Sequence, residues 1–291
     1  MAHKVIENLR SRVPYIRRLH RRIDELNHKL AAIVPAPELH PLYGSQNSKV
    51  VAEFRAFLRL LQPHDVAHAR KRRFGCDADG GYIMLEDFGQ ARTALSLGIG
   101  SEVSWDVDVA NRGLNVIQFD HTVDRPPQDH PRFAFNRARV VGQRRTPGDV
   151  TLCDILTRPN LAGENDFVAK IDIEGSEWDL LARTERATLA RISQMVIEFH
   201  YVRSFVEPSW RATALSALEN LMDTHVCIHV HGNNWGPFTV VGGFAFPNCF
   251  EASFVRRSDH TVVPSTATFP TDLDRPSNPR VPDFYLGRWN Y

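Results

Sequence analysis

The sequence has few cysteines, almost no net charge and no long apolar run. Its four cysteines form no C-x-x-C pair, which argues against a zinc ribbon or a disulfide framework and fits a reducing cytoplasm: Cys76, Cys153, Cys227 and Cys249. No signal peptide and no stretch of about 18 apolar residues is present, so no membrane-spanning segment is predicted. The formal net charge of +1 does not indicate a surface-wide preference for nucleic acid. With 43% hydrophobic and 24% charged residues, the composition favours a globular, cytoplasmic protein.

One βαβ unit, residues 93–120, organises the chain. A buried strand (94–97) leads into the glycine turn Gly98-Ile99-Gly100, a helix, and a second strand that ends in Asp120. Ligands of open α/β sheets bind at the carboxyl ends of the strands, and glycines let a ligand approach the backbone. An acidic residue that closes the second strand suits the two hydroxyls of a ribose. The sequence therefore predicts a cofactor that contains a nucleoside.

A missing glycine indicates which cofactor this is. A dinucleotide fingerprint needs a third glycine, so that a pyrophosphate can reach the helix N-terminus. Here Gly100 is followed by Ser101, Glu102, Val103 and Ser104. Glu102 would repel a pyrophosphate, whereas the ammonium of an amino-acid cofactor would tolerate it. We therefore expect S-adenosylmethionine rather than NAD.

The N-terminal region has a different pattern. After Pro14, apolar residues recur at heptad spacing up to Ile33, on a basic helix that is followed by a proline-rich linker. This pattern fits a short coiled coil that joins copies of the chain, or equally a helix that packs on its own domain. We expect residues 1–47 to be a helical extension and linker, 48–257 the main domain, and 258–291 a proline-rich tail that packs on its surface.

Several further elements are predicted from periodicity and turn residues. They are a helix from Ser48 to about Ala69, a strand near 133–141, a short helix over 150–156, a strand over 168–173, a helix from Glu177 to about Ala190, a strand over 192–199, a helix over 208–222, and strands over 225–231, 240–246 and 251–255.

Acidic residues and histidines stand at the ends of three of these strands. Asp172 and Glu174 close one strand, Glu198 and His200 end the next, and His229 and His231 alternate on a third. Strand ends beside the cofactor are where catalysis or metal binding would occur. The alternatives are that Glu174 caps the following helix, and that the histidines are ordinary core or surface residues.

Two stretches resemble a known family. Leu95 to Gly100 and the string Lys170-Ile171-Asp172-Ile173-Glu174-Gly175-Ser176-Glu177-Trp178 are similar to the FkbM-type family of S-adenosylmethionine-dependent methyltransferases. The segments Asp79-Gly80-Gly81-Tyr82, 197–200 and 231–234 look like further elements of one branch. The resemblance covers about residues 71–257. It implies a class I methyltransferase (Rossmann-like) α/β fold, with a seven-stranded, mostly parallel sheet and helices on both faces, and methyl transfer mainly to hydroxyls of sugars or natural products.

On these grounds the expected cofactor-binding residues are Asp79, Gly81, Ser96, Gly98, Gly100, Glu102, Asp120 and Asp172. A weakly acidic sugar hydroxyl needs a base or a metal to become nucleophilic. In one mechanism Asp172, Glu198 and His231 hold a divalent ion such as Mg²⁺, Mn²⁺ or Zn²⁺. In the other, His200 or His231 is the general base, and a carboxylate, Asp172 among the candidates, orients it.

The prediction is thus an O-methyltransferase for a sugar, polysaccharide or glycosylated metabolite, forming a homo-oligomer through its N-terminal helix. Two other classes stay open. An NAD-dependent oxidoreductase would use the same βαβ unit, and a non-catalytic scaffold could retain the fold. A nucleic-acid methyltransferase is less favoured, because no Asn-Pro-Pro-Tyr-like motif is present.

Overall fold

The computed structural model describes residues 47–291. The expected coiled-coil helix, its basic face and the linker that follows it, up to residue 46, lie outside the described residues.

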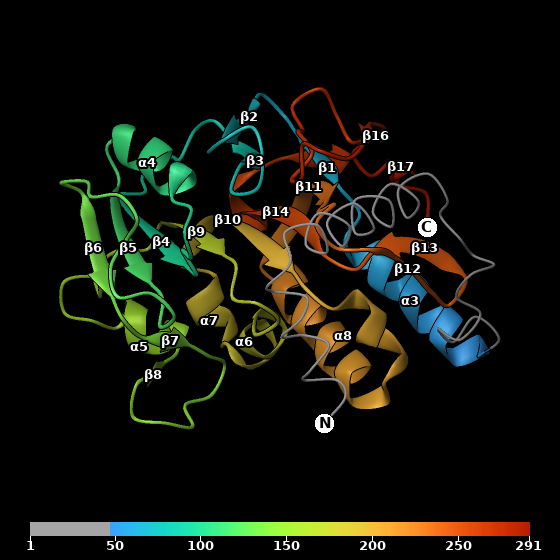
Figure 1. Ribbon diagram of the computed structural model, residues 1–291, viewed down its shortest axis with the longest axis horizontal. Helices are drawn as coiled ribbons and strands as arrows, with labels where there is room; N and C mark the ends of the chain where they lie inside the picture. Colours follow the sequence, from blue (N-terminus) through green and yellow to red (C-terminus); the bar gives the residue numbers. More distant parts are fainter. Residues whose placement is uncertain (1–46) are drawn as a thin grey trace, which may run out of the picture.

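A seven-stranded sheet forms the centre of the molecule (Figure 1). Its strands lie side by side in the order β11 (His225–Gly232), β14 (Phe250–Arg256), β10 (Ile192–Phe199), β9 (Phe167–Ile171), β4 (Thr93–Leu97), β5 (Asn115–Phe119) and β6 (Phe133–Asn136). Strand β14 is antiparallel to both of its neighbours, and the other pairs are parallel. This order, with one reversed strand, is that of the class I methyltransferase (Rossmann-like) fold, so the expected fold class is confirmed.

The two faces of the sheet are buried in separate cores, because strand side chains alternate with a period of two. Leu95, Ile117 and Ala169 belong to the larger core. That core also takes in helices α3 (Ser48–Leu60), α5 (Leu152–Leu156), α6 (Glu177–Arg183), α7 (Arg186–Leu189) and α8 (Pro208–Met222). Ala94 and Val116 face the smaller core, formed with α4 (Ser104–Asn111) and the hairpin of β2 (Lys71–Phe74) and β3 (Tyr82–Leu85). The chain therefore forms three layers around buried strands.

Two predicted helices are shorter in the structure. Helix α3 ends at Leu60 rather than near Ala69, because Pro63 follows and strand β1 (His64–Val66) begins directly after it. The predicted helix 177–190 divides into α6 and α7, because Thr184 is extended (ψ 130°). The Asn220 side chain donates to the carbonyls of Leu181 and Thr184. These two bonds satisfy carbonyls that the break leaves free.

Two strand predictions also change. The segment predicted as one strand over 133–141 is β6 and a separate short strand, β7 (Arg139–Val140), which pairs with β8 (Asp149–Val150). The segment predicted as one strand over 240–246 is the hairpin of β12 (Phe238–Val241) and β13 (Phe244–Pro247). Gly242 and Gly243 turn this hairpin with φ of 57° and 85°, a region that favours glycine.

The C-terminal segment packs on the domain through buried side chains. Its short strands pair β15 (Val262–Pro264) with β1 and β16 (Thr268–Phe269) with β17 (Gly287–Arg288). Phe269 and Trp289 are buried, and the Trp289 indole donates to the Leu58 carbonyl at 2.8 Å. Within residues 47–291, no helix is both long and apolar enough to cross a membrane.

Candidate functional site

A cavity of about 330 Å³ lies at the carboxyl ends of β4, β5 and β9. Its lining comes from the segments 98–102, 119–122, 138–140 and 170–176, and from Asp79, Gly80 and Tyr82 of the β2–β3 hairpin. The cavity thus lies where an open α/β sheet binds its ligand, and its volume is in the range of small-molecule sites.

The glycine turn after β4 forms one wall of the cavity. Gly98 has φ of 80°, and a Cβ there would lie 1.7 Å from the carbonyl oxygen of Asp172. Gly100 has φ of 49°, and a Cβ there would have no atom within 4 Å. Gly98 is therefore required by the close contact between two strand ends, while Gly100 leaves the backbone open toward the cavity.

Asp120 braces this turn from the end of β5. Its Oδ2 accepts hydrogen bonds from the backbone N–H groups of Ile99 and Gly100, both at 2.9 Å. Its Oδ1 accepts from the N–H and the hydroxyl of Thr122, at 2.7 and 2.6 Å. Burial alone would raise the pKa of Asp120, but these hydrogen bonds lower it below its usual value. Asp120 therefore lines the cavity as a carboxylate whose four lone-pair positions are all engaged.

Glu102 occupies the start of helix α4. Its Oε1 accepts a hydrogen bond from the backbone N–H of Ser104 at 2.7 Å. A carboxylate thus stands where a dinucleotide pyrophosphate would meet the helix N-terminus, and like charges would repel each other there.

Two of the predicted cofactor residues, Ser96 and Gly81, do not line the cavity. Ser96 is buried within β4, and its hydroxyl has no hydrogen-bond partner among the described residues. Gly81 lies in the hairpin loop, where a Cβ would lie 1.9 Å from the Cys76 carbonyl oxygen, so its small size serves the turn. Lys170, the first residue of the motif string, was assigned no role from the sequence, but it lines the cavity and donates to the Gly98 carbonyl at 2.6 Å.

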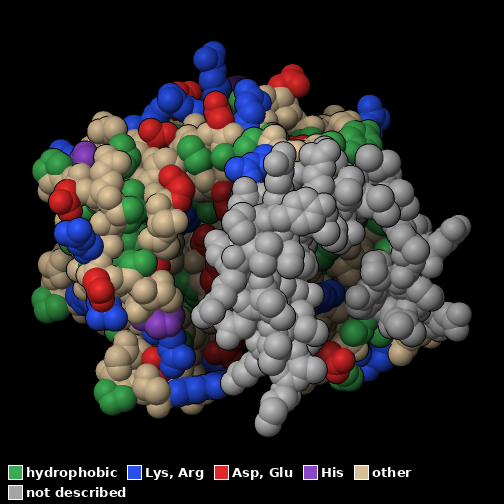
Figure 2. All heavy atoms as spheres, in the orientation of Figure 1, with side chains coloured by type: hydrophobic (Ala, Val, Ile, Leu, Met, Phe, Trp, Pro, Cys, Tyr) green, Lys and Arg blue, Asp and Glu red, His purple; other side chains and the backbone are tan. Residues whose placement is uncertain are grey.

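The lining is strongly acidic. Five carboxyl groups line it: Asp79, Glu102, Asp120, Asp172 and Glu174. Burial raises the pKa of Asp79 to about 7 and that of Asp172 well above its usual range, so these two carry less negative charge at neutral pH than ordinary aspartates do. The lining also includes two cationic side chains: Lys170, which donates to the Gly98 carbonyl within the cavity wall, and Arg139, which donates to both carboxylate oxygens of Asp149 outside it. Figure 2 agrees with this distribution, with acidic side chains in the shaded recess of the face that it shows. The cavity suits a cationic ligand better than an anionic one.

His200 lies among the acidic residues at the ends of β9 and β10. Its Nε2 lies 3.3 Å from Glu198, 3.6 Å from Glu174 and 3.9 Å from Asp172. Its Nδ1 lies 3.1 Å from Glu177, whose carboxylate also accepts from the His200 backbone N–H at 2.7 Å. Sequence reasoning did not assign Glu177 a role, although the i, i+3 spacing from Glu174 in the motif was a usable signal.

The pKa values at this edge are shifted in opposite directions. Burial alone would lower the pKa of His200, but hydrogen bonds to Cys249, Glu177 and Glu198 raise it well above its usual value. Burial, and then the charge of Glu198, raise the pKa of Asp172 well above its usual range, against Lys170 and His200. Burial would also raise the pKa of Glu198, but the bond to His200 lowers it. His200 is therefore an imidazolium at neutral pH, and Asp172 is the more basic carboxylate.

His231 lies in a different group. Its Nδ1 is 3.2 Å from Glu251 and its Nε2 is 3.0 Å from Asp283 of the C-terminal segment. Similarly, His229 Nε2 is 2.8 Å from Asp274. Both ring nitrogens of His231 are thus held by carboxylates. The structure does not bring it to Asp172 and Glu198, the residues with which a metal site was predicted, and His200 occupies that place.

Backbone strain gathers at the same edge. Three described residues other than glycine have positive φ, and two of them flank His200: Glu174 at 53° and Tyr201 at 64°. The Tyr201 residue is 43% exposed, and its ring packs against Gly175, where a Cβ would meet it at 2.5 Å. Residues held in such conformations concentrate at functional sites.

Among known proteins, this chain is similar to solved structures that share its fold. No protein-family model matches the sequence. No curated protein matches it either. Several solved structures are similar, among them three methyltransferases. A TehB-like SAM-dependent methyltransferase from Corynebacterium glutamicum is 14% identical over 58% of this chain and 82% of its own, with a TM-score of 0.31. The 16S rRNA (adenine(1408)-N(1))-methyltransferase from Catenulisporales acidiphilia is 12% identical over 57% and 87%, with a TM-score of 0.30.

The plantazolicin methyltransferase BpumL, solved in complex with SAH, is 8% identical over 80% of this chain and 95% of its own, with a TM-score of 0.27. The fold class follows from the strand order of the sheet.

Proposed function

We propose that this protein is an S-adenosylmethionine-dependent O-methyltransferase, and that its acceptor is a hydroxyl of a sugar, polysaccharide or glycosylated metabolite. The observation that carries the proposal is the acidic cavity at the glycine turn, at the carboxyl ends of β4, β5 and β9. S-adenosylmethionine carries a sulfonium and an ammonium, and both positive charges suit the acidic lining. NAD carries a pyrophosphate, which Glu102 opposes at the start of α4.

The residues of the cavity suggest how the cofactor would be held. Gly100 leaves room at the turn, and the backbone around it is braced by Asp120. A ribose hydroxyl could reach Asp120 by replacing the hydroxyl of Thr122, which donates to the same carboxylate. S-adenosylmethionine, when bound, supplies a methyl group that is already electrophilic, so the protein needs mainly to align an acceptor oxygen.

Asp172 is the proposed general base. It lines the cavity, and burial gives it a raised pKa, which makes it a better proton acceptor than an exposed aspartate. His200 is not suited to the predicted role of general base, because its raised pKa keeps it protonated. We assign it a positioning role instead, in which its positive charge holds Glu198 and Asp172 in place. The proton of the acceptor hydroxyl would pass to an Asp172 oxygen as the new O–CH₃ bond forms.

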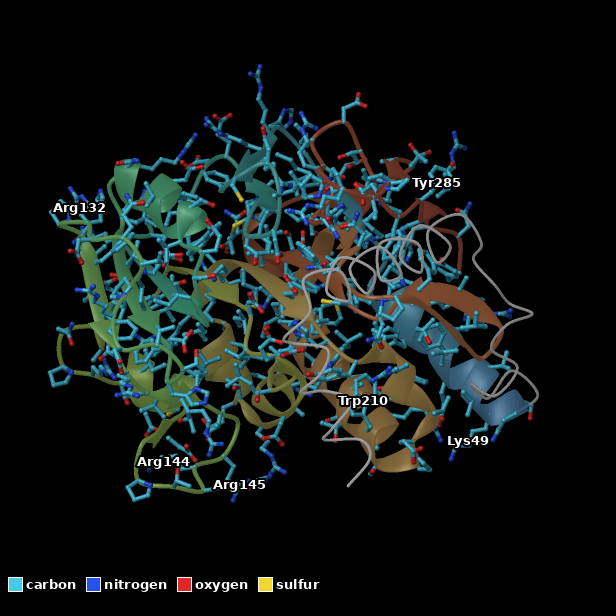
Figure 3. The ribbon with its side chains drawn as sticks, in the orientation of Figure 1. Lys49, Arg132, Arg144, Arg145, Trp210 and Tyr285 are labelled. Carbon is cyan, nitrogen blue, oxygen red and sulfur yellow. The ribbon has the colours of Figure 1, made fainter. Side chains whose placement is uncertain are left out.

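The exposed Tyr201 ring supports a sugar acceptor. It lies beside Gly175, next to the cavity residues Glu174 and Ser176, and an aromatic face is a surface on which the C–H groups of a sugar ring can pack. Basic side chains do not gather at the cavity. The arginines labelled in Figure 3, Arg132, Arg144 and Arg145, point outward at the edge of the molecule.

The test is calorimetric titration of S-adenosylmethionine, and separately of NAD, into the chelator-treated protein. We expect micromolar binding of S-adenosylmethionine and none of NAD. A panel of sugars and glycosides is then assayed for transfer of a labelled methyl group, with Asp172→Asn as the inactive control. Binding of NAD alone would overturn the proposal in favour of an oxidoreductase.

A further inference from the structure

Two buried glutamates face each other across the sheet. Glu198 of β10 and Glu251 of β14 are direct partners in the antiparallel register, so their side chains lie on the same face. Glu198 is 6% exposed and Glu251 is 5% exposed. Like charges at directly opposite positions destabilise a sheet, and burial removes the water that would screen them. His200 lies 3.3 Å from Glu198 and His231 lies 3.2 Å from Glu251, so any further cation must bind at the carboxylate oxygens that these two rings leave unbonded.

A third carboxylate completes the group. Asp79 reaches it from the β2–β3 hairpin loop, and one oxygen each of Asp79, Glu198 and Glu251 lies within 4.8 Å of the other two. We call these residues the three-carboxylate cluster. Asp79 also lines the cavity, so the cluster is continuous with the proposed cofactor site.

Neighbouring donors satisfy only part of the cluster. Glu251 receives Ser277 on one oxygen and His231 on the other. Glu198 Oε1 receives Asn233 and Cys249. In contrast, Glu198 Oε2 is buried and has no hydrogen-bond partner among the described residues. A buried carboxylate oxygen without a donor in a native structure calls for a water, an ion or a proton at that place.

The nearest guanidinium does not fill this gap. Arg73 donates from Nε to the Cys76 carbonyl at 2.8 Å and from Nη2 to the Ala78 carbonyl at 2.7 Å. These hydrogen bonds go to the hairpin backbone, while Nη1 is buried without a hydrogen-bond partner among the described residues, and the charge of Arg73 lowers the pKa of Glu251. His231 is shared between Glu251 and Asp283, so its charge is balanced by a carboxylate outside the cluster.

We propose that Asp79, Glu198 and Glu251 bind one divalent cation of the class that prefers oxygen ligands: Mg²⁺, Mn²⁺ or Ca²⁺. Three carboxylates are the ligands that such ions take, and Asp79 at the cavity leaves the site open to solvent and substrate. Two other groups of potential ligands are less suitable. In Glu198, His200 and Cys249, the thiol and the imidazole are already bonded to Glu198. In Asp172, Glu174 and His200, the imidazole ring is already held by Glu177.

The role of this ion rests on the proposed function. A cation at Asp79 would stand in the wall of the cavity, where it could bind the acceptor hydroxyl. As a Lewis acid it would make loss of the hydroxyl proton to Asp172 easier, and it would orient the oxygen toward the methyl group. The binding of the ion itself does not depend on this role and can be tested separately.

The experiment uses the chelator-treated full chain and Mn²⁺ alone, with free Mn²⁺ followed by electron paramagnetic resonance. We expect one bound ion per chain. Glu251→Gln and Asp79→Asn should each weaken Mn²⁺ binding by at least about tenfold. Replacing a residue that only hydrogen-bonds to a metal ligand already causes a loss of about this size. Glu174→Gln is the matched control, because it removes a carboxylate of the same cavity that lies outside the cluster, and its affinity should match the wild type.

Thermal unfolding checks that each variant is folded. Asp79 lies on a loop that remains partly exposed, so Asp79→Asn supplies the test if Glu251→Gln does not fold. Absence of Mn²⁺ binding by the wild-type chain would overturn the proposal, as would binding that Glu174→Gln abolishes and Asp79→Asn leaves intact. S-adenosylmethionine is titrated into the same preparation. Binding of S-adenosylmethionine without binding of Mn²⁺ would contradict only the cation-site proposal. Binding of Mn²⁺ without binding of S-adenosylmethionine would contradict only the methyltransferase proposal.

Discussion

The ammonium of Lys170 donates a hydrogen bond to the carbonyl oxygen of Gly98 at 2.6 Å. Lys170 is 4% exposed and lies on β9, directly opposite Ser96 of the neighbouring strand β4. Its charge also lowers the pKa values of Asp106 and Asp172, both of which burial raises. One buried cation thus ties the glycine turn to the proposed catalytic carboxylate.

Replacing this cation should destabilise the protein. In Lys170→Met the Gly98 carbonyl loses its charged donor, and Asp106 and Asp172 lose a counter-charge, so we expect a loss of about 2 kcal/mol in the free energy of unfolding. Lys49→Met, at a side chain that is 73% exposed, is the control and should change stability by less than about 0.5 kcal/mol. Urea unfolding of both variants measures the difference, and equal midpoints would contradict the structural role of Lys170.

The two glycines of the turn should respond differently to alanine. Gly98→Ala places a Cβ 1.7 Å from the Asp172 carbonyl oxygen, so β4 and β9 must move apart and the protein should fold poorly. Gly100→Ala meets no atom within 4 Å and pays only for its positive φ, about 1–2 kcal/mol. Gly100→Ala should therefore fold, yet bind S-adenosylmethionine less tightly because its methyl group faces the ligand. Circular dichroism and calorimetry separate the two effects, and tight cofactor binding by Gly100→Ala would argue against contact at this turn.

Asp172→Asn should separate catalysis from binding. An amide cannot accept the acceptor proton, so we expect the transfer rate to fall by about 10²- to 10⁴-fold while cofactor affinity changes little. Because the pKa of Asp172 is raised, the wild-type rate should increase with pH as this carboxyl loses its proton, above the pH at which an ordinary aspartate titrates. That rising limb should be absent from the residual rate of Asp172→Asn. A variant with the wild-type rate would assign the base to another residue.

Stability should fall in mild acid because of His225. Burial lowers the pKa of this histidine from 6.5 to about 4, and its Nε2 is bonded to the Ile192 carbonyl oxygen. The unfolded chain therefore takes up a proton at a higher pH than the folded protein does. The contribution of His225 is complete above pH 6.5 and is lost progressively as the pH falls toward 4, about 3 kcal/mol in all.

The matched variant is His225→Gln, whose amide can donate to the same carbonyl and does not titrate. The free energy of unfolding, measured at intervals from pH 7 to 4, should fall less steeply for the variant than for the wild type. Other groups that titrate in this range, such as the buried His229, are present in both proteins and cancel in the comparison. Identical slopes would show that His225 is not kept neutral by the fold.

The local sequence pattern determined the elements and the position of the site. The strand 192–199 and the helix 208–222 have the predicted bounds, because long runs of apolar residues and a proline at the first helical turn are local signals. The glycine turn and the acidic strand ends at Asp120 and Asp172 were equally local. They line one cavity because the carboxyl ends of parallel strands share one edge of the sheet.

The tertiary structure alone decided which side chains meet. Strand β14 inserts between β10 and β11 although it follows both in the sequence, and this placement sets Glu251 opposite Glu198. Asp283, more than fifty residues away in the sequence, is hydrogen-bonded to His231. His200 is therefore the histidine that lies near Asp172 and Glu198. Cross-strand register and tail contacts depend on pairings between distant segments, and no local period of the sequence encodes them. The sequence alone therefore placed the glycine turn and the acidic strand ends of the proposed cofactor site, while the fold determined the partners of its carboxylates and histidines.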